Sequence, residues 1–165
     1  MNTSEFVYTA KETASIESFK TTWKTPSNIA LVKYWGKSDP QIPKNASISF
    51  TLNSCHTITS ISFEKKTTTQ IEFDLFFEGK AKNEFKPKIA QFFERILKYC
   101  PYLLDYKMII ASENSFPHSS GIASSASGMS AIAMCIMTLE QRLNAELSKD
   151  HMTRKASFLA RLGSG

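Results

Sequence analysis

Residues 115–135 read "SFPHSSGIASSASGMSAIAMC", a serine-rich segment that runs directly into an apolar one. Gly121 and Gly128 lie among the serines. A helix N-terminus offers about four unpaired backbone N–H groups and about half a unit of positive charge, and glycine lets a ligand approach the backbone closely. The segment therefore predicts a helix over about 121–143 that begins either with a phosphate-binding loop or with a Ser/Gly-rich cap that holds no ligand. It lacks the Gly-Lys-Ser/Thr of a Walker A loop.

Four segments before this helix repeat apolar residues with a period of two. This period is typical of strands with one buried face, and we interpret the first three as antiparallel strands and the fourth as a further strand. The segments are residues 47–52, 57–63, 71–77 and 106–112.

A helical repeat lies between Pro87 and Pro101, and a last helix is expected from about Ser148. The first repeat consists of Ile89, Phe92, Phe93, Ile96 and Leu97; the second points Met152, Ala156 and Leu159 inward. The order of strands, helix, strand, helix and helix predicts an α+β fold, with a mixed or antiparallel sheet and helices on one face. The closing Arg-Leu-Gly-Ser-Gly, residues 161–165, has the composition of a loop interrupted part-way.

A second unusual segment, residues 25–37, reads "TPSNIALVKYWGK". A short apolar strand there leads to Lys33 and Lys37, which flank Tyr-Trp-Gly. Two ammonium groups and the Tyr34 hydroxyl at the end of a strand could clamp a diphosphate. The alternative is an ordinary strand end with exposed lysines and with Trp35 in the core.

Composition narrows the classes of function. The formal charge of +5 and the pI near 9.1 suit anionic ligands, but no run of like charges indicates nucleic acid. Three cysteines at irregular spacing form no metal motif, so we expect reduced thiols and a cytoplasmic protein. The N-terminus lacks the order of a signal peptide, and the serines within 122–139 favour a buried helix over a membrane span.

Taken together, several segments resemble the N-terminal region of the diphosphomevalonate decarboxylases, a family of the GHMP small-molecule kinase superfamily. They are PSNIALVKYWGK (26–37), NASISFTL (45–52), SENSFPHSSGIASSASG (112–128) and ARLGSG (160–165). The resemblance implies a GHMP-kinase-like N-terminal domain (ribosomal protein S5 domain 2-like) over residues 23–165. It would follow a polar lead-in, residues 1–22, and stop before the C-terminal half.

The resemblance also implies a reaction. ATP, with Mg²⁺, would phosphorylate the 3-hydroxyl of 5-diphosphomevalonate, and loss of phosphate and carbon dioxide would give isopentenyl diphosphate in the mevalonate pathway. The full-length enzyme is expected to be a homodimer without a nucleic-acid or membrane partner. Two alternatives stay open: another GHMP-type kinase or a mevalonate monophosphate decarboxylase, and a non-catalytic nucleotide-binding module.

The family's site residues carry over by resemblance. Asn28 would orient the catalytic carboxylate, and Lys33 would lie between the substrate and nucleotide phosphates. The substrate would be bound by Tyr34, Trp35, Gly36, Lys37, Lys88, Ser164 and Gly165. ATP would be bound by Ser119, Ser120, Gly121, Ile122, Ala123, Ser124 and Ser125.

Three departures from the family pattern matter. Lys88 stands where the family has an arginine, which keeps the charge and loses the bidentate geometry. His118 stands where the family usually has threonine, so we assign it no catalytic role and expect a satisfied or exposed loop histidine. The family's catalytic aspartate has no counterpart in this chain, Asp39 and Asp74 included. No metal-ligating residue is assigned, and we expect the chain alone to be inactive.

Overall fold

The computed structural model describes residues 3–9, 15–39 and 41–164. Gly165, one of the expected substrate-binding residues, lies outside the described residues. The strands are β1 (Ser18–Val32), β2 (Lys37–Ser38), β3 (Ile42–Pro43), β4 (Ile48–Lys65), β5 (Glu72–Phe77), β6 (Lys80–Ala81) and β7 (Tyr106–Asn114). The helices are α1 (Lys86–Ile96), α2 (Ser124–Leu143) and α3 (Lys149–Ser164), with short 3-10 turns at Ser4–Phe6, Asn83–Phe85 and Pro101–Asp105.

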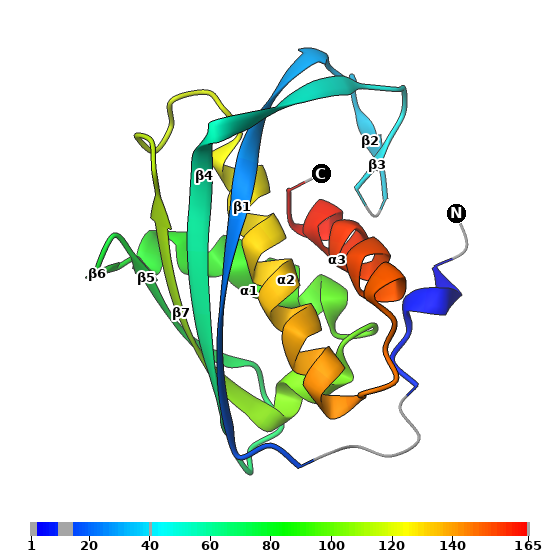
Figure 1. The fold of residues 1–165 in the computed structure, drawn as a ribbon, viewed down its shortest axis with the longest axis vertical. Helices are drawn as coiled ribbons and strands as arrows, with labels where there is room; N and C mark the ends of the chain where they lie inside the picture. Colours follow the sequence, from blue (N-terminus) through cyan, green and yellow to red (C-terminus); the bar gives the residue numbers. More distant parts are fainter. Residues whose placement is uncertain (1–2, 10–14, 40, 165) are drawn as a thin grey trace.

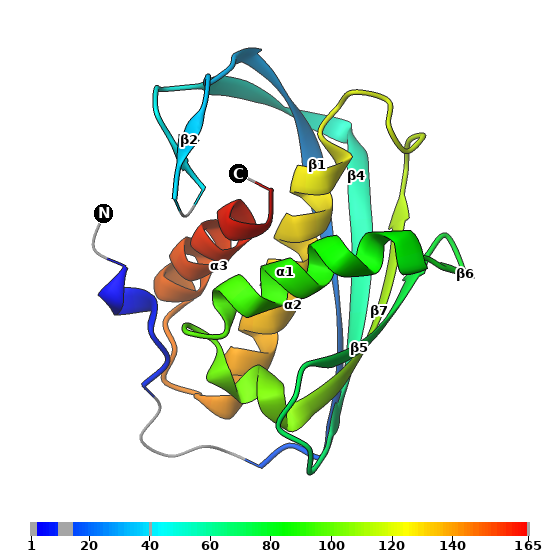
Figure 2. The same cartoon turned by 180° about the vertical axis from the view of Figure 1, so that it is seen from behind.

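A five-stranded sheet in the order β1-β4-β7-β5-β6 forms one layer, and the three α-helices cover one of its faces (Figures 1 and 2). The α+β prediction and the helices on one face are therefore confirmed. The expectation that residues 71–77 pair antiparallel holds for β5 with β6 but is wrong for β5 with β7, because those two strands run parallel. The sheet is therefore mixed. α1 lies between β5 and β7 in the chain and carries it back along the sheet, as a parallel connection requires.

The first and second expected strands, 47–52 and 57–63, are one continuous strand, β4. The polar residues between them form an irregularity, since the β1 partner jumps from Pro26 opposite His56 to Ser27 opposite Leu52. Pro26 has no N–H to donate to a ladder, which suits a break in the pairing. β1 begins at Ser18, so the last part of the expected lead-in belongs to the sheet.

Beyond this irregularity, β1 and β4 continue as a two-stranded arm past the ends of the helices (Figure 1). The arm comprises residues 28–32 and 48–51, paired with each other. It carries exposed apolar side chains, namely Ile29, Leu31, Val32, Ile48 and Phe50.

α2 packs between the sheet and α3, and its Ile136 and Met137 are fully buried. The buried helix expected over 122–139 is therefore present, starting at Ser124 rather than near residue 121. None of the helices in the described ranges is long and apolar enough to cross a membrane. The N-terminal segment packs on α3, where the ring of Phe6 stacks on that of Phe158 with centroids 4.9 Å apart.

α3 continues to Ser164, so the loop expected at 161–165 is wrong for residues 161–164. Gly163 explains the difference, because it is a packing residue within the helix rather than a turn. A Cβ there would lie 2.7 Å from Met129 Sδ and 2.8 Å from Phe92 Cδ2. Only glycine lets α3 approach α2 and α1 this closely.

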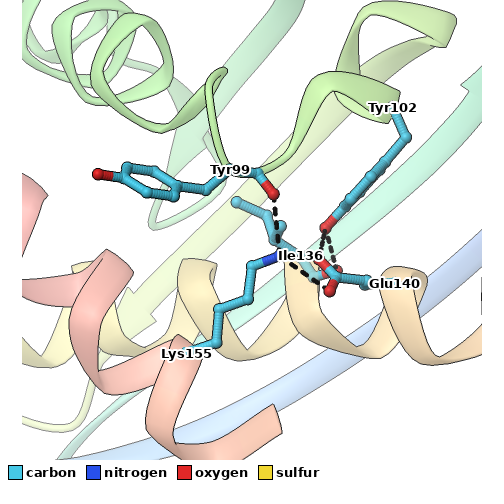
Figure 3. Close-up of polar contacts among 5 residues, drawn as sticks. All are labelled: Tyr99, Tyr102, Ile136, Glu140 and Lys155. Atoms are coloured by element: carbon cyan, nitrogen blue, oxygen red, sulfur yellow. Dashed lines mark hydrogen bonds and ion pairs between the residues drawn. The ribbon is translucent and has the colours of Figure 1, made fainter. Parts of the chain in front are cut away.

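The core between α2 and α3 contains an ion pair (Figure 3). Lys155 Nζ donates to both Glu140 carboxylate oxygens, at 2.8 and 2.7 Å, and to the Tyr99 carbonyl oxygen at 2.9 Å. The Tyr102 hydroxyl donates to the same carboxylate at 2.8 Å. Burial raises the pKa of the Tyr102 hydroxyl well above its usual value, so that this donor keeps its proton. Each of the two buried charges therefore has several polar partners, as burial demands.

Candidate functional site

The loop that precedes α2 has an unusual backbone. Ser119, Gly121 and Ala123 all have positive φ angles, of 65°, 81° and 56°. Residues other than glycine adopt this region at a cost of about 1–2 kcal/mol. In the described part of the chain, no backbone N–H from residue 119 to 125 donates to a protein acceptor. Successive free N–H groups in such a turn, at a helix N-terminus, form an anion-binding concavity.

Side chains of the sheet hold this loop and the first turn of α2 in place. The Ser27 hydroxyl donates to the Ile122 carbonyl, and the Thr25 hydroxyl donates to the Ser127 carbonyl at 2.7 Å. The Thr57 and Ser127 hydroxyls lie 2.6 Å apart. The sequence reasoning missed these residues. The sequence signal that could have found them is a polar residue at a strand position that faces inward, where an apolar residue is expected.

A cavity of about 390 Å³ opens beside the loop, between β5, β7, α1 and α2. Ser124 and Ser125, two of the expected ATP-binding residues, line it together with Lys88. Its apolar wall consists of Leu75, Phe77, Phe85, Ile89, Met129 and Ile132. A largely apolar hollow with a few convergent polar groups is typical of a small-molecule site.

A second hollow, a groove of about 460 Å³, runs between α2 and α3 under the β2–β3 hairpin. Tyr34, Arg161 and Ser164 line it. The Ser125 and Ser164 hydroxyls lie 3.0 Å apart, so the cavity and the groove meet at the start of α2. The structure thus brings Tyr34 and Ser164 together, and it places Lys88 in the cavity instead of in this groove.

The bend after β1 is shaped by Asn45, which the sequence reasoning also missed. The Asn45 side-chain oxygen accepts from the Trp35 backbone N–H at 2.7 Å, and Lys44 N–H donates to the Gly36 carbonyl at 3.2 Å. Gly36 has a φ of 81°, which favours glycine. Asn45 follows Pro43 in a turn-rich stretch, and an Asn that bonds nearby backbone is the signal that could have found it.

Trp35 is 83% exposed, so the alternative that placed this side chain in the core is wrong. Lys33 and Lys37 are also exposed, and Lys37 Nζ lies 5.9 Å from the centre of the Tyr34 ring. Among the described residues, these three side chains line neither hollow. Asn28 lies on the arm and donates to the Ser49 hydroxyl at 3.1 Å. The roles assigned to these four residues stay predictions.

No group of three or more acidic, histidine or cysteine side chains in the described residues could hold a metal ion. A cation that accompanies an anionic ligand would therefore depend on the ligand's own oxygens and on hydroxyl groups such as those of Ser124 and Ser125.

Residues 25–165 match the family model for the diphosphomevalonate decarboxylase-like N-terminal domain. The chain belongs to this family. Diphosphomevalonate decarboxylase from Saccharomyces cerevisiae is 34% identical over 96% of the chain and 38% of its own length. The Bos taurus enzyme is 31% identical over 87% of the chain and 37% of its own length. The chain thus spans under two-fifths of the length of these curated relatives.

Solved structures of this family agree with the fold. The mevalonate diphosphate decarboxylase from Enterococcus faecalis aligns with a TM-score of 0.69 at 32% identity, over 90% of this chain and 43% of that one. A structure of MDDEF in complex with MVAPP, AMPPCP and magnesium aligns with a TM-score of 0.69 at 31% identity, over 90% and 42% of the two chains. The GHMP-kinase-like N-terminal domain is therefore the fold of this chain.

Proposed function

We propose that this chain is the ATP- and substrate-binding N-terminal part of an enzyme that uses ATP to convert (R)-5-diphosphomevalonate to isopentenyl diphosphate. The observation that carries the proposal is the row of backbone N–H groups from 119 to 125 that donate to no acceptor in the described chain. Membership of the family and the complex of MDDEF with MVAPP, AMPPCP and magnesium support it. The homodimer and the cytoplasmic location stay predictions.

The two hollows can divide two anionic ligands between them. The nucleotide phosphates would lie on the loop N–H groups and the Ser124 and Ser125 hydroxyls, with the rest of the nucleotide in the cavity. The substrate would lie in the groove, where Tyr34 and Ser164 supply hydroxyl donors. The Ser125–Ser164 contact, where the two hollows meet, supports this arrangement, because a phosphoryl group would pass between the ligands there.

Phosphoryl transfer depends mainly on positioning and on stabilising charge, which these groups can provide. Magnesium bound to the nucleotide would neutralise part of the phosphate charge. The terminal phosphoryl group of ATP would move to the tertiary hydroxyl oxygen of the substrate, with ADP as the leaving group. The hydroxyl proton would pass to the catalytic carboxylate, which has no counterpart in this chain. The bond to the substrate's own carboxylate then breaks, its electron pair forms the new carbon–carbon double bond, and phosphate departs from the neighbouring carbon as carbon dioxide is released.

Calorimetric titration of the folded chain with a non-hydrolysable ATP analogue and magnesium tests the proposal. Gly121→Ala should weaken binding at least tenfold, because alanine resists the φ of 81° that orients the loop N–H groups. Gly79→Ala is the matched control. It has a φ of 75°, and an added Cβ meets nothing within 4 Å at either glycine. Gly79→Ala should therefore lose similar stability and keep its affinity.

The substrate half of the proposal has its own measurement. Titration with 5-diphosphomevalonate should give tighter binding than with 5-phosphomevalonate, whereas the reverse order would favour the monophosphate decarboxylase alternative. The chain alone should not hydrolyse ATP in the presence of either substrate, since it lacks a counterpart of the catalytic aspartate. If neither the nucleotide nor the substrate bound to the folded chain, the proposed function would be wrong.

A further inference from the structure

Three aromatic rings form one wall of the cavity beside the loop. Phe77 ends β5, Phe85 ends the 3-10 turn before α1, and His118 immediately precedes the loop. The His118 ring centre lies 5.5 Å from that of Phe77 and 5.2 Å from that of Phe85. Segments far apart in the sequence thus bring their rings together at the cavity, and all three side chains line it.

The rings meet at steep angles and do not stack. Phe77 and Phe85 are inclined by 71°, Phe77 and His118 by 67°, and Phe85 and His118 by 43°. The two pairs that Phe77 makes are edge-to-face, an arrangement that aromatic pairs favour, and the Phe85–His118 pair is tilted; together these three rings form a corner. A flat aromatic ligand can lie against one ring of a corner while the other rings contact its edge.

His118 is exposed, although two phenylalanine rings adjoin it. Among the described residues, the charged side chains that line the same cavity are Glu84 and Lys88, and Lys82 Nζ lies 5.6 Å from the centre of the Phe85 ring. These charges are of both signs, so the cavity does not select strongly for an anion. The apolar wall instead favours an uncharged planar group.

We propose that the His118 ring binds the base of the nucleotide. Of the three rings in the aromatic corner, it is the one that directly precedes the loop proposed to bind the phosphates. This inference rests on the proposed function and adds a residue that sets affinity for the base. One continuous segment, 118–125, would then hold both ends of the nucleotide, with the imidazole ring against the base and the N–H groups on the phosphates. Stacking of a base on an aromatic side chain contributes enough to change affinity about tenfold.

Two probes separate the base from the phosphates: a non-hydrolysable ATP analogue and inorganic tripolyphosphate, each titrated with magnesium into the full chain. His118→Ala should weaken binding of the ATP analogue about tenfold and leave tripolyphosphate affinity unchanged. His118→Phe, which retains a ring, should bind the ATP analogue within about threefold of the unmodified chain. A purely structural role in the loop would change the affinity for both probes together.

His151→Ala is the matched control. His151 also meets a phenylalanine ring edge-on, with its centre 5.8 Å from that of Phe6, but it lines neither hollow. This variant should bind both probes like the unmodified chain. Equal losses for both probes with His118→Ala, or no loss for the ATP analogue, would overturn the inference and leave the proposed function standing. If the unmodified chain bound neither the ATP analogue nor tripolyphosphate, both this inference and the proposed function would be overturned.

Discussion

Lys155 shows how a single residue can be misjudged from its type. It is fully buried, yet lysine is among the residues least often buried. The helical stripe of Met152, Ala156 and Leu159 predicted the inward face of α3, and all three are buried as expected. Position 155 belongs to the same stripe by spacing, so the buried lysine could have been found. Its partner Glu140 could not, because a sequence does not say which helices pack together.

The buried pair makes a prediction about stability. Lys155→Met should lower the free energy of unfolding by about 3–5 kcal/mol, because it leaves the Glu140 carboxylate charged and without its cation. Lys155→Met combined with Glu140→Leu should recover part of that loss, since no buried charge then remains. Urea unfolding followed by circular dichroism measures both.

Lys82→Ala is the control for this measurement. Lys82 and Glu84 form an ion pair at 2.9 Å, but both side chains reach solvent: that of Lys82 is 34% exposed and that of Glu84 is 66% exposed. Removing that pair should cost less than about 1 kcal/mol. A loss of under about 1 kcal/mol for Lys155→Met as well would show that the buried pair contributes no more than a surface one.

At the scale of elements, periodicity predicted the helices well and their ends less well. The apolar repeat from Ile89 to Leu97 matches α1, and Pro87 falls in its first turn. The serine-rich segment does lead into a helix, but Ala123 adopts a left-handed conformation and delays the start to Ser124. Gly163 misled the prediction at the other end. Glycine usually marks a turn, and only tertiary packing reveals that it is needed inside α3.

Gly163→Ala should destabilise the protein although alanine is the better helix former. The intrinsic gain of about 1 kcal/mol is outweighed, because the new methyl group would lie 2.7–2.9 Å from Met129 and Phe92 atoms in the core. We expect a net loss of about 1–3 kcal/mol in urea unfolding. The shift of α3 should also separate Ser164 from Ser125 and weaken substrate binding.

Gly128→Ala provides the opposite case for the same measurement. Gly128 lies in α2, and a Cβ added there meets no atom within 4 Å. This variant should gain about 0.5–1 kcal/mol from helix propensity alone. If Gly163→Ala were equally stabilising, the close approach of α3 to α2 would not depend on that glycine.

At the scale of the whole molecule, the residues of the candidate site divide between a packed body and an open arm. The loop, the cavity and Ser164 belong to the body, where helices and sheet bury the surrounding side chains. Asn28 lies on the arm, and Lys33 directly follows β1 at its end. Strand patterns predicted that these segments exist. They could not predict that the arm extends beyond the helices. Alternating apolar and polar residues show that the two faces of a strand differ, but not which other elements cover each face.

The division into body and arm predicts that protection of backbone amides from hydrogen exchange differs between the two halves of β4. Residues 48–51 pair with β1 alone, whereas residues 57–64 pair with both β1 and β7. Local opening exposes an amide more often where few contacts must break, so amides of the arm should exchange hydrogen at least about tenfold faster than those of 57–64. Hydrogen–deuterium exchange with mass spectrometry on peptides from each half of β4 measures this difference. Dilution controls for self-association through the exposed Ile48 and Phe50, which would protect the arm at high concentration. Equal protection of both halves in dilute solution would mean that the arm is as rigid as the body, and that Asn28 and the loop belong to one preformed site.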